Sequence, residues 1–265
     1  MGKLDGKVAV VTGGAMGNGL GIVRVFLKHG ASVVVFDYAD SLSQSLTTLK
    51  QEYPNSNIIG YKADIRDNRM LDACFKDLVG KMGQVDILVN NAGVCELASF
   101  ETMTDEVRDK QFDINIKGTW NMTKAALPHI KARGEGSIIN LSSVTGVTVA
   151  DPGEVAYATT KAALLGFTKG LAAELVKDKI RVNAILPGYI RTPMVEAMAR
   201  LSNPEDPESV ITGITKAIPM GRMGTPEELG ELAAFLASGE SSYITGQGIV
   251  FDGASTLPET TTMGV

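Results

Sequence analysis

Three polar side chains in the middle of the chain have the types and spacing that suit proton and hydride transfer at a carbonyl group. Tyr157 and Lys161 lie four residues apart, so on a helix they share one face. Ser143 precedes Tyr157 by 14 residues and follows a strand-like run. A tyrosine hydroxyl can protonate a ketone oxygen as hydride reaches the carbon, and a serine hydroxyl can polarise that oxygen. These residues predict an oxidoreductase that interconverts secondary alcohols and ketones.

The lysine is expected to tune the acidity of the tyrosine. A free phenol has a pKa near 10, and moving it to near 7 takes about 4 kcal/mol. One ammonium about 4 Å away supplies roughly this amount in a partly water-excluded site. We therefore expect Lys161, helped by the positive nicotinamide ring of the oxidised cofactor, to lower the pKa of Tyr157, and we expect it to hold the ribose beside the nicotinamide.

A glycine-rich turn near the N-terminus is typical of a dinucleotide site. Gly13, Gly17 and Gly19 lie between a strand-like run and a helical pattern, together with Met16 and Asn18. Glycine lets the backbone turn tightly and approach a pyrophosphate, and the amide groups at the start of the following helix face the phosphates. Placed between a first strand and a first helix, this turn predicts a nucleotide site.

Asp37 indicates which dinucleotide is preferred. It ends the second predicted strand, 18 residues after Gly19, where a carboxylate accepts hydrogen bonds from the adenosine ribose. The 2′-phosphate of NADP would meet like charge there, at roughly 4 kcal/mol for unit charges about 4 Å apart. No basic residue compensates, since Tyr38 and Ala39 follow. We expect NAD to be preferred over NADP.

Short β-branched runs alternate with longer helical patterns along the chain. Apolar strands with little alternation fit a parallel sheet covered on both faces, so the pattern predicts an α/β fold: one doubly wound, Rossmann-type domain over residues 1–265 with a seven-stranded parallel sheet. The expected strands are Val8–Val11, Ser32–Phe36, Ile58–Lys62, Ile87–Val89, Ser137–Leu141, Arg181–Leu186 and Ile249–Phe251. The expected helices include Leu20–His29, Met70–Met82, Glu106–Ala132, Tyr157–Val176 and Pro226–Ser238. Ligands bind outside the carboxyl ends of such strands, where the serine, the tyrosine–lysine face and the glycine turn converge.

The alternation is interrupted between the sixth and seventh strands. Residues 192–223 hold two short amphipathic patterns around the acidic, proline-containing piece Asn203–Glu208, which makes this insertion a candidate substrate lid. Its apolar residues favour packing on the protein body over contact with substrate: Met194, Val195, Met198, Leu201, Val210, Ile211 and Ile214. The threonine-rich tail after Gly253 lacks periodicity, and we expect it either to be mobile or to dock on a neighbouring subunit.

Composition and charge argue against several classes of function. A net charge of −5 without long single-sign runs argues against nucleic acid and anionic membranes as partners. The cysteines Cys74 and Cys95 lie far apart and the histidines His29 and His129 are isolated, so we expect reduced thiols and no metal site. Neither a signal-like start nor a bilayer-length apolar run is present, which favours a cytoplasmic protein with a small-molecule substrate.

These motifs together resemble those of the short-chain dehydrogenase/reductase family, over nearly the whole chain. They are Thr12–Gly19, Asn90–Gly93, Asn115, Ser143, Tyr157 with Lys161, and Pro187–Thr192. The resemblance implies an NAD-dependent enzyme acting on CH–OH groups, with Asn115, Ser143, Tyr157 and Lys161 as catalytic residues. The spacing from Ser143 to Tyr157 is one residue longer than is commonest in the family, so the loop at 151–153 is expected to bulge.

The resemblance also implies roles for single residues. Asn115 would hold a water that relays protons from Lys161, Asp64 and Ile65 would contact the adenine, and Ile190 and Thr192 would bind the nicotinamide carboxamide. The implied cofactor-binding residues are Gly13, Met16, Gly17, Asn18, Gly19, Asp37, Asp64, Ile65, Asn91, Ala92, Gly93, Tyr157, Lys161, Pro187, Gly188, Ile190 and Thr192. Family members usually form tetramers or dimers through the helices that hold Asn115 and Tyr157, so a homotetramer or a homodimer is expected.

Other functions remain open at this stage. A hydroxysteroid or bile acid dehydrogenase fits if the lid's apolar residues face the crevice. A ketoacyl reductase would want a basic docking patch near the entrance, whereas the lid carries Glu205, Asp206 and Glu208. A catalytically silent NAD-sensing protein belongs to a different class, and relatives of that kind usually lack the tyrosine or the lysine.

Overall fold

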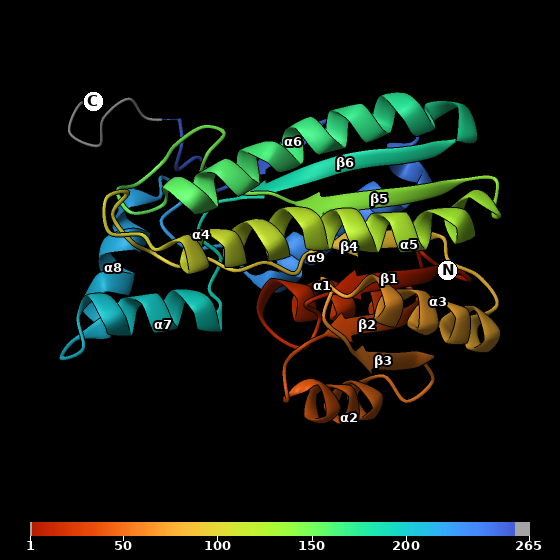
Figure 1. Ribbon diagram of the computed structural model, residues 1–265. Helices are drawn as coiled ribbons and strands as arrows, with labels where there is room; N and C mark the ends of the chain where they lie inside the picture. The colour runs from red at the N-terminus through yellow and green to blue at the C-terminus, as the bar shows by residue number, and fades with distance from the viewer. Residues whose placement is uncertain (1, 258–265) are drawn as a thin grey trace.

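The computed structural model describes residues 2–257 and is built around a seven-stranded, all-parallel sheet in the order β3-β2-β1-β4-β5-β6-β7 (Figure 1). The strands are β1 (Val8–Thr12), β2 (Ser32–Asp37), β3 (Ile58–Lys62), β4 (Ile87–Asn90), β5 (Gly136–Leu141), β6 (Ile180–Pro187) and β7 (Gly248–Phe251). The predicted α/β class and parallel sheet are confirmed, and the ends of every strand lie within one residue of those expected. Buried β-branched runs bounded by polar residues are therefore a sufficient signal for these strands.

The strand order reverses at the centre of the sheet. Val11 of β1 pairs with Val35 of β2 on one side and with Val89 of β4 on the other. The chain passes from β3, at one edge, back across β2 and β1 to β4. The loops after β1 and β4 therefore diverge and leave a crevice at the carboxyl ends of these strands, where doubly wound sheets bind ligands.

Helices cover both faces of the sheet (Figure 1). One face holds α1 (Gly17–Lys28), α2 (Leu42–Glu52) and α9 (Pro226–Ala237), and the other holds α3 (Asn68–Met82), α5 (Thr119–Lys131) and α6 (Val155–Leu175). Only Leu42 and Leu49 of α2 are buried, so its apolar pattern is too weak to predict from sequence.

The helices α1 and α9 touch backbone to backbone. A Cβ atom added at Gly21 of α1 would lie 2.4 Å from Pro226 of α9, and one added at Gly230 would lie 2.9 Å from the Gly21 carbonyl oxygen. Glu231 also pairs with Lys28 at 2.9 Å and with His29 at 2.7 Å. The helix that follows the glycine turn is thus seated on a helix from the far end of the chain.

A chain of buried amides and hydroxyls joins the two central strands to the helices above them. The Asn90 side-chain amide donates to the Asn140 side-chain oxygen at 2.9 Å and to the Thr123 hydroxyl at 3.0 Å. The Asn140 side-chain amide donates to the Thr168 hydroxyl at 2.9 Å. Because all four residues are buried, these bonds fix β4 and β5 relative to α5 and α6.

The structure corrects one predicted helix. The range Glu106–Ala132 is not one regular helix but α4 (Asp105–Phe112), a π-helical segment η1 (Asp113–Gly118) and then α5. A Cβ added at Gly118 would lie 2.4 Å from the Ile65 side chain, so the close approach of the loop after β3 requires glycine here. The wider turn holds Asn115, and such π turns are frequent at functional sites.

The insertion after β6 folds as two helices, α7 (Pro193–Ser202) and α8 (Pro207–Ala217). Thr192 and Asp206 cap them and each helix begins with proline, so the acidic proline-containing piece is a helix-start signal. The expectation that the apolar residues pack mainly on the protein body is wrong, because they form a small core of their own between the two helices. That core contains Ala199, Ile211, Ile218 and Met223, with Val195, Val210 and Ile214 against it. Two further residues from the expected set, Met194 and Leu201, are exposed.

The helix pair lies at the carboxyl end of the sheet, the same end as the start of α6 (Figure 1).

After β7 the chain makes turns held by Asp252, which accepts the backbone amides of Ala254 and Thr256, both at 2.9 Å. The rest of the threonine-rich tail falls outside the described residues 2–257. Within that described range, no helix is long and apolar enough to cross a membrane.

Candidate active site

The four predicted catalytic side chains come together where β4 and β5 end. Ser143 follows β5, Tyr157 and Lys161 lie in the first two turns of α6, and Asn115 lies in the π-helical segment. Ser143, Lys161 and Asn115 are buried, and Tyr157 is partly buried. A Cβ added at Gly93 would lie 3.2 Å from the Asn115 side-chain oxygen and 3.4 Å from Lys161 Nζ, so the loop after β4 passes directly beside this group.

Lys161 is held by the backbone of β5. Its Nζ donates to the Leu141 carbonyl oxygen at 2.7 Å and lies 5.6 Å from the centre of the Tyr157 ring. Burial lowers the pKa of Lys161 to about 8. The ammonium is therefore fixed at the face of the phenol ring by a partner that does not change with protonation.

The acidity of Tyr157 differs from the expectation. Burial raises the pKa of Tyr157, and the nearby Cys95 raises it further, while the hydrogen bond with Ser143 lowers it. The Lys161 ammonium is engaged with a carbonyl group and lies at the ring face, so it does not outweigh the burial. The protein side chains alone therefore do not lower the phenol pKa, and the lowering expected beside the oxidised nicotinamide ring stays a prediction. Tyr157 is protonated at neutral pH and can act as a proton donor.

Asn115 fixes the loop after β4 through both ends of its amide. Its nitrogen donates to the Val94 carbonyl oxygen at 2.9 Å and to the Thr160 hydroxyl at 3.0 Å. Its oxygen accepts the Val94 backbone amide at 2.8 Å. The side chain thus acts first as a positioning group that joins this loop to α6, and the expected water relay stays a prediction.

The glycine turn after β1 needs glycine at the positions that the sequence singled out. Gly13 and Gly17 have φ values of +64° and +53°, in the left-handed region. A Cβ added at Gly19 would lie 2.0 Å from the Gly13 carbonyl oxygen, which no side chain could tolerate. The turn therefore closes on itself and presents backbone, rather than side chains, to the crevice.

The loop after β4 clamps this turn. The Asn91 side-chain amide donates to the carbonyl oxygens of Thr12 and Gly13 at 2.9 and 3.0 Å. The Thr12 hydroxyl accepts the backbone amides of Asn91 and Ala92, both at 3.0 Å. The structure therefore shows Asn91 and Ala92 supporting the turn, and any direct contact with a cofactor stays a prediction.

The start of α1 has the properties of a phosphate and ribose site. Met16 is the N-cap and provides no side-chain cap, so the first amide groups of the helix are available to an anion. The Asn18 side-chain oxygen is buried and has no hydrogen-bond partner within residues 2–257. A turn that excludes side chains, available helix amides and this buried acceptor fit a dinucleotide.

Asp37 is rigidly oriented at the end of β2. One carboxylate oxygen accepts the Ala15 backbone amide and the other accepts the Ala39 backbone amide, both at 2.8 Å. The carboxylate is thereby tied to the glycine turn, and its remaining lone pairs can accept hydroxyl groups. This is the geometry expected of a ribose acceptor.

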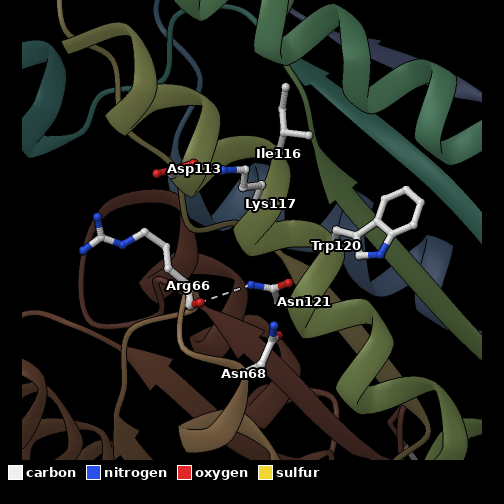
Figure 2. Close-up of a pocket in the computed structure, with 7 residues that line it drawn as sticks. All are labelled: Arg66, Asn68, Asp113, Ile116, Lys117, Trp120 and Asn121. Carbon is white, nitrogen blue, oxygen red and sulfur yellow. Dashed lines mark hydrogen bonds and ion pairs between the residues drawn. The ribbon is translucent and has the colours of Figure 1, made fainter. Parts of the chain in front are cut away.

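The segment after β3, which was expected to contact the adenine, makes several bonds to other protein groups. Asp64 pairs with Arg66 at 2.6 Å, and the Asn121 side-chain amide donates to the Ile65 carbonyl oxygen at 3.2 Å. The same amide donates to the Arg66 carbonyl oxygen at 3.4 Å (Figure 2). Figure 2 shows the neighbouring cavity of about 370 Å³, lined by Arg66, Asn68, Asp113, Ile116, Lys117, Trp120 and Asn121. None of the four catalytic candidates lines it, so it is separate from the catalytic crevice. Contact of Asp64 and Ile65 with adenine stays a prediction.

The segment after β6 closes the other side of the crevice. Pro187 ends β6, and Gly188 approaches Asp252 so closely that a Cβ would lie 2.8 Å from the Asp252 Cβ. Ile190 is buried and bridges to Gly224. A Cβ added at Gly17 would lie 3.7 Å from Thr192, so this threonine lies beside the glycine turn. The nucleotide turn and the base of the α7–α8 pair are thus neighbours.

One acidic residue of the crevice was missed. Glu154 is the residue immediately before α6 and lies three positions before Tyr157, the spacing of neighbours along one face of a helix. Its spacing to the tyrosine is the signal that could have identified it.

Comparison with known proteins places the chain in a family. Residues 13–256 match a family profile described as Enoyl-(Acyl carrier protein) reductase. The Oxidoreductase UcpA of Escherichia coli is 55% identical over 265 residues, which is 100% of both chains. The chain belongs to the short-chain dehydrogenase/reductase family. It is therefore an oxidoreductase of that family.

Solved structures of this family are similar in fold. L-Sorbose reductase from Gluconobacter frateurii, complexed with NADPH and L-sorbose, has a TM-score of 0.91 and 32% identity, covering 97% of this chain and 99% of that one. Carveol dehydrogenase from Mycobacterium avium, in complex with NAD, has a TM-score of 0.90 and 30% identity, covering 97% of this chain and 100% of that one. Structures with this fold therefore bind NADPH in one case and NAD in the other. The preference of this chain between NAD and NADP depends on its own residues.

Proposed function

We propose that this protein is an NAD-dependent dehydrogenase/reductase that transfers hydride between the nicotinamide and a secondary alcohol or ketone. The observation that carries the proposal is the convergence of Ser143, Tyr157 and Lys161 on the crevice that the glycine turn opens. Bound NAD would supply the hydride acceptor, and NADH the hydride donor. In ketone reduction the Tyr157 hydroxyl gives its proton to the substrate oxygen, which the Ser143 hydroxyl holds.

The remaining residues support these two groups. Lys161 presents its ammonium to the Tyr157 ring while the Leu141 carbonyl fixes it. An ammonium at this place stabilises the phenolate that forms once the proton has left. Asn115 holds the loop after β4 against α6 and so keeps the crevice shaped for substrate.

The preference for NAD rests on Asp37. Its carboxylate is held by two backbone amides, so it cannot swing away from a 2′-phosphate without losing both. Tyr38 and Ala39 follow it and offer no cation. Like-charge repulsion therefore favours the cofactor with a free 2′-hydroxyl.

The surroundings of the crevice support a small-molecule substrate taken from solution. The α7–α8 pair would act as the lid over residues 192–223, since it has its own small core and joins the body next to the glycine turn. Trp120 of α5 is 57% exposed and its ring lies 5.4 Å from that of Phe167 on α6. This apolar pair suits a homodimer or homotetramer interface on α5 and α6, in a cytoplasmic protein.

Two measurements test the function. Quenching of protein fluorescence or enhancement of nicotinamide fluorescence gives the affinity for NADH and NADPH, and a panel of secondary alcohols with NAD gives turnover. We expect NADH to bind more tightly than NADPH and at least one class of secondary alcohol to be oxidised. Failure to bind either nucleotide would refute the proposal, and binding without turnover on a broad panel would favour the NAD-sensing alternative.

A further inference from the structure

A buried carboxylate oxygen in the crevice has no partner. Glu154 Oε2 is shielded from solvent and makes no hydrogen bond within the described residues 2–257. Glu154 occupies the N-cap position of α6, yet its side chain does not cap that helix. Buried polar atoms are nearly always hydrogen-bonded, and an unpaired one is costly, so this acceptor is a candidate for a ligand group.

The surroundings of the carboxyl group place it on the substrate side of Tyr157. Its charge raises the pKa of three groups: Cys95 after β4, Tyr157 on α6 and Tyr189 after β6. A carboxylate acts on all three only if it lies among the loops that follow these strands. Burial raises the pKa of Glu154 itself and the charge of Asp151 adds to the effect, while hydrogen bonds of its carboxyl group with the Asp151 backbone and the Thr145 side chain lower it. The unpartnered atom is therefore Oε2 alone.

The position of the carboxylate is set by the backbone. Gly153, with a φ of +89°, accepts the Ala98 amide at 3.1 Å, so the loop before α6 is fixed to the loop after β4. The Glu154 carbonyl oxygen accepts the Ala158 amide at 2.7 Å as the first bond of the helix. The backbone of Glu154 is therefore fixed at the start of the turn that carries Tyr157.

We propose that Glu154 is a specificity-determining residue that accepts a hydrogen bond from a second hydroxyl group on the substrate, next to the carbon that exchanges hydride. The inference rests on the proposed function and narrows its substrate class to uncharged vicinal diols, polyols and hydroxyketones. Glu154 is the N-cap of α6 and precedes Tyr157 by three residues, the spacing of neighbouring side chains along one face of a helix. A site built to bond a hydroxyl rejects an analogue that lacks it, because its buried acceptor stays unpaired.

A hydroxyl group fits this acceptor better than the other polar groups of small substrates. A carboxylate or phosphate would meet Glu154 and Asp151 as like charges. An ammonium would have to give up its hydration shell in a buried site, a cost that the attraction to the carboxylate need not recover. A neutral donor avoids both penalties.

Three alcohols of nearly equal size test the proposal. Butan-2-ol, propane-1,2-diol and 1-aminopropan-2-ol differ only in the group next to the reacting carbon, which is methyl, hydroxyl or ammonium. Oxidation moves the C–H hydride to NAD and releases the hydroxyl proton, giving butanone, hydroxyacetone or aminoacetone. We expect kcat/KM for the diol to exceed that for butan-2-ol by about 10- to 100-fold, mostly through KM.

Variants at Glu154 locate the source of this selectivity. Glu154→Leu should reduce the diol-to-butanol ratio to about 1 while butan-2-ol is still oxidised, and Glu154→Gln, which keeps an acceptor, should retain part of the ratio. Turnover of butan-2-ol reports that each variant is folded. Glu96→Gln is the matched control, because it removes a carboxylate from the loop after β4 whose partner is Lys110, and it should leave the ratio unchanged.

The outcomes separate this inference from the function on which it rests. Equal rates for diol and butan-2-ol, or a ratio unchanged in Glu154→Leu, would overturn the inference and indicate that a water satisfies the acceptor. Preference for the amino alcohol would overturn it in favour of an ion pair. Turnover of none of the three with NADH still bound would overturn the inference alone, whereas loss of NADH binding in the wild type would refute the proposed function.

Discussion

The pH dependence of stability gives a direct test of how Lys161 is buried. Its pKa is lowered from 10.5 to about 8 by burial in the folded protein. Each tenfold loss of proton affinity corresponds to about 1.4 kcal/mol, so full protonation costs the folded state about 3 kcal/mol. The folded pKa lies below the unfolded one, so this cost is absent above pH 10.5 and fully present below pH 8.

The magnitude follows from the same two values. At pH 7 the cost is about 3 kcal/mol and at pH 9.5 about 1.4 kcal/mol, so the free energy of unfolding should rise by about 2 kcal/mol on this account. Lys161→Met removes the titrating group and keeps an apolar stem of similar length. Other groups titrate in both proteins, so the difference between wild type and variant isolates the lysine.

The assay is urea unfolding of both proteins at pH 7 and pH 9.5, followed by far-ultraviolet circular dichroism. The unpaired Leu141 carbonyl lowers the stability of the variant equally at both pH values, so it cancels in the comparison. A pH dependence that agrees between the two proteins to within about 0.5 kcal/mol would refute the reasoning, since it would mean that the ammonium is solvated in the folded state.

Three further predictions concern the other parts of the site and the core. Tyr157→Phe should lower turnover by about 10²- to 10⁴-fold, because the proton donor is lost, while the Kd for NADH stays within about twofold. Asp37→Asn should lower the ratio of kcat/KM with NAD to kcat/KM with NADP by about 10- to 100-fold, because the like-charge repulsion is removed. Asn140→Ala should lower the free energy of unfolding by about 2–4 kcal/mol in urea titrations, because the buried Asn90 amide loses an acceptor and the buried Thr168 hydroxyl loses a donor.

Each of these has its own control or contradicting result. Full turnover in Tyr157→Phe would remove the tyrosine from the mechanism. An unchanged nucleotide ratio in Asp37→Asn would mean that the carboxylate does not face the ribose. Asn57→Ala, at an exposed asparagine, should change stability by less than about 0.5 kcal/mol and calibrates the effect of Asn140.

Much of the fold and of the site can be predicted from the sequence because several signals coincide. The strands are apolar and short, and Gly13, Gly17 and Gly19 are needed by the backbone itself. The four-residue spacing of Tyr157 and Lys161 has meaning only on a helix. These features are local, so a single sequence contains them.

The missed features depend on contacts between distant segments. The π-helical segment that holds Asn115 coincides with the packing of Ile65 on Gly118, and nothing in the run from 105 to 132 indicates it. The raised pKa of Tyr157 comes from burial by the surrounding loops, which spacing alone does not report. The unpaired state of Glu154 Oε2 depends on how the loop at Gly153 packs against the loop after β4, so it appears only once both loops are placed.

The contact between α1 and α9 has a consequence for the order in which the protein can mature during synthesis. The face of α1 at Gly21 is covered by residues that begin at Pro226. In a nascent chain that still lacks those residues, the face of α1 at Gly21 is exposed to solvent. The N-terminal half therefore cannot acquire a finished nucleotide pocket while it is being made, and cofactor capture must wait until nearly the whole polypeptide has left the ribosome.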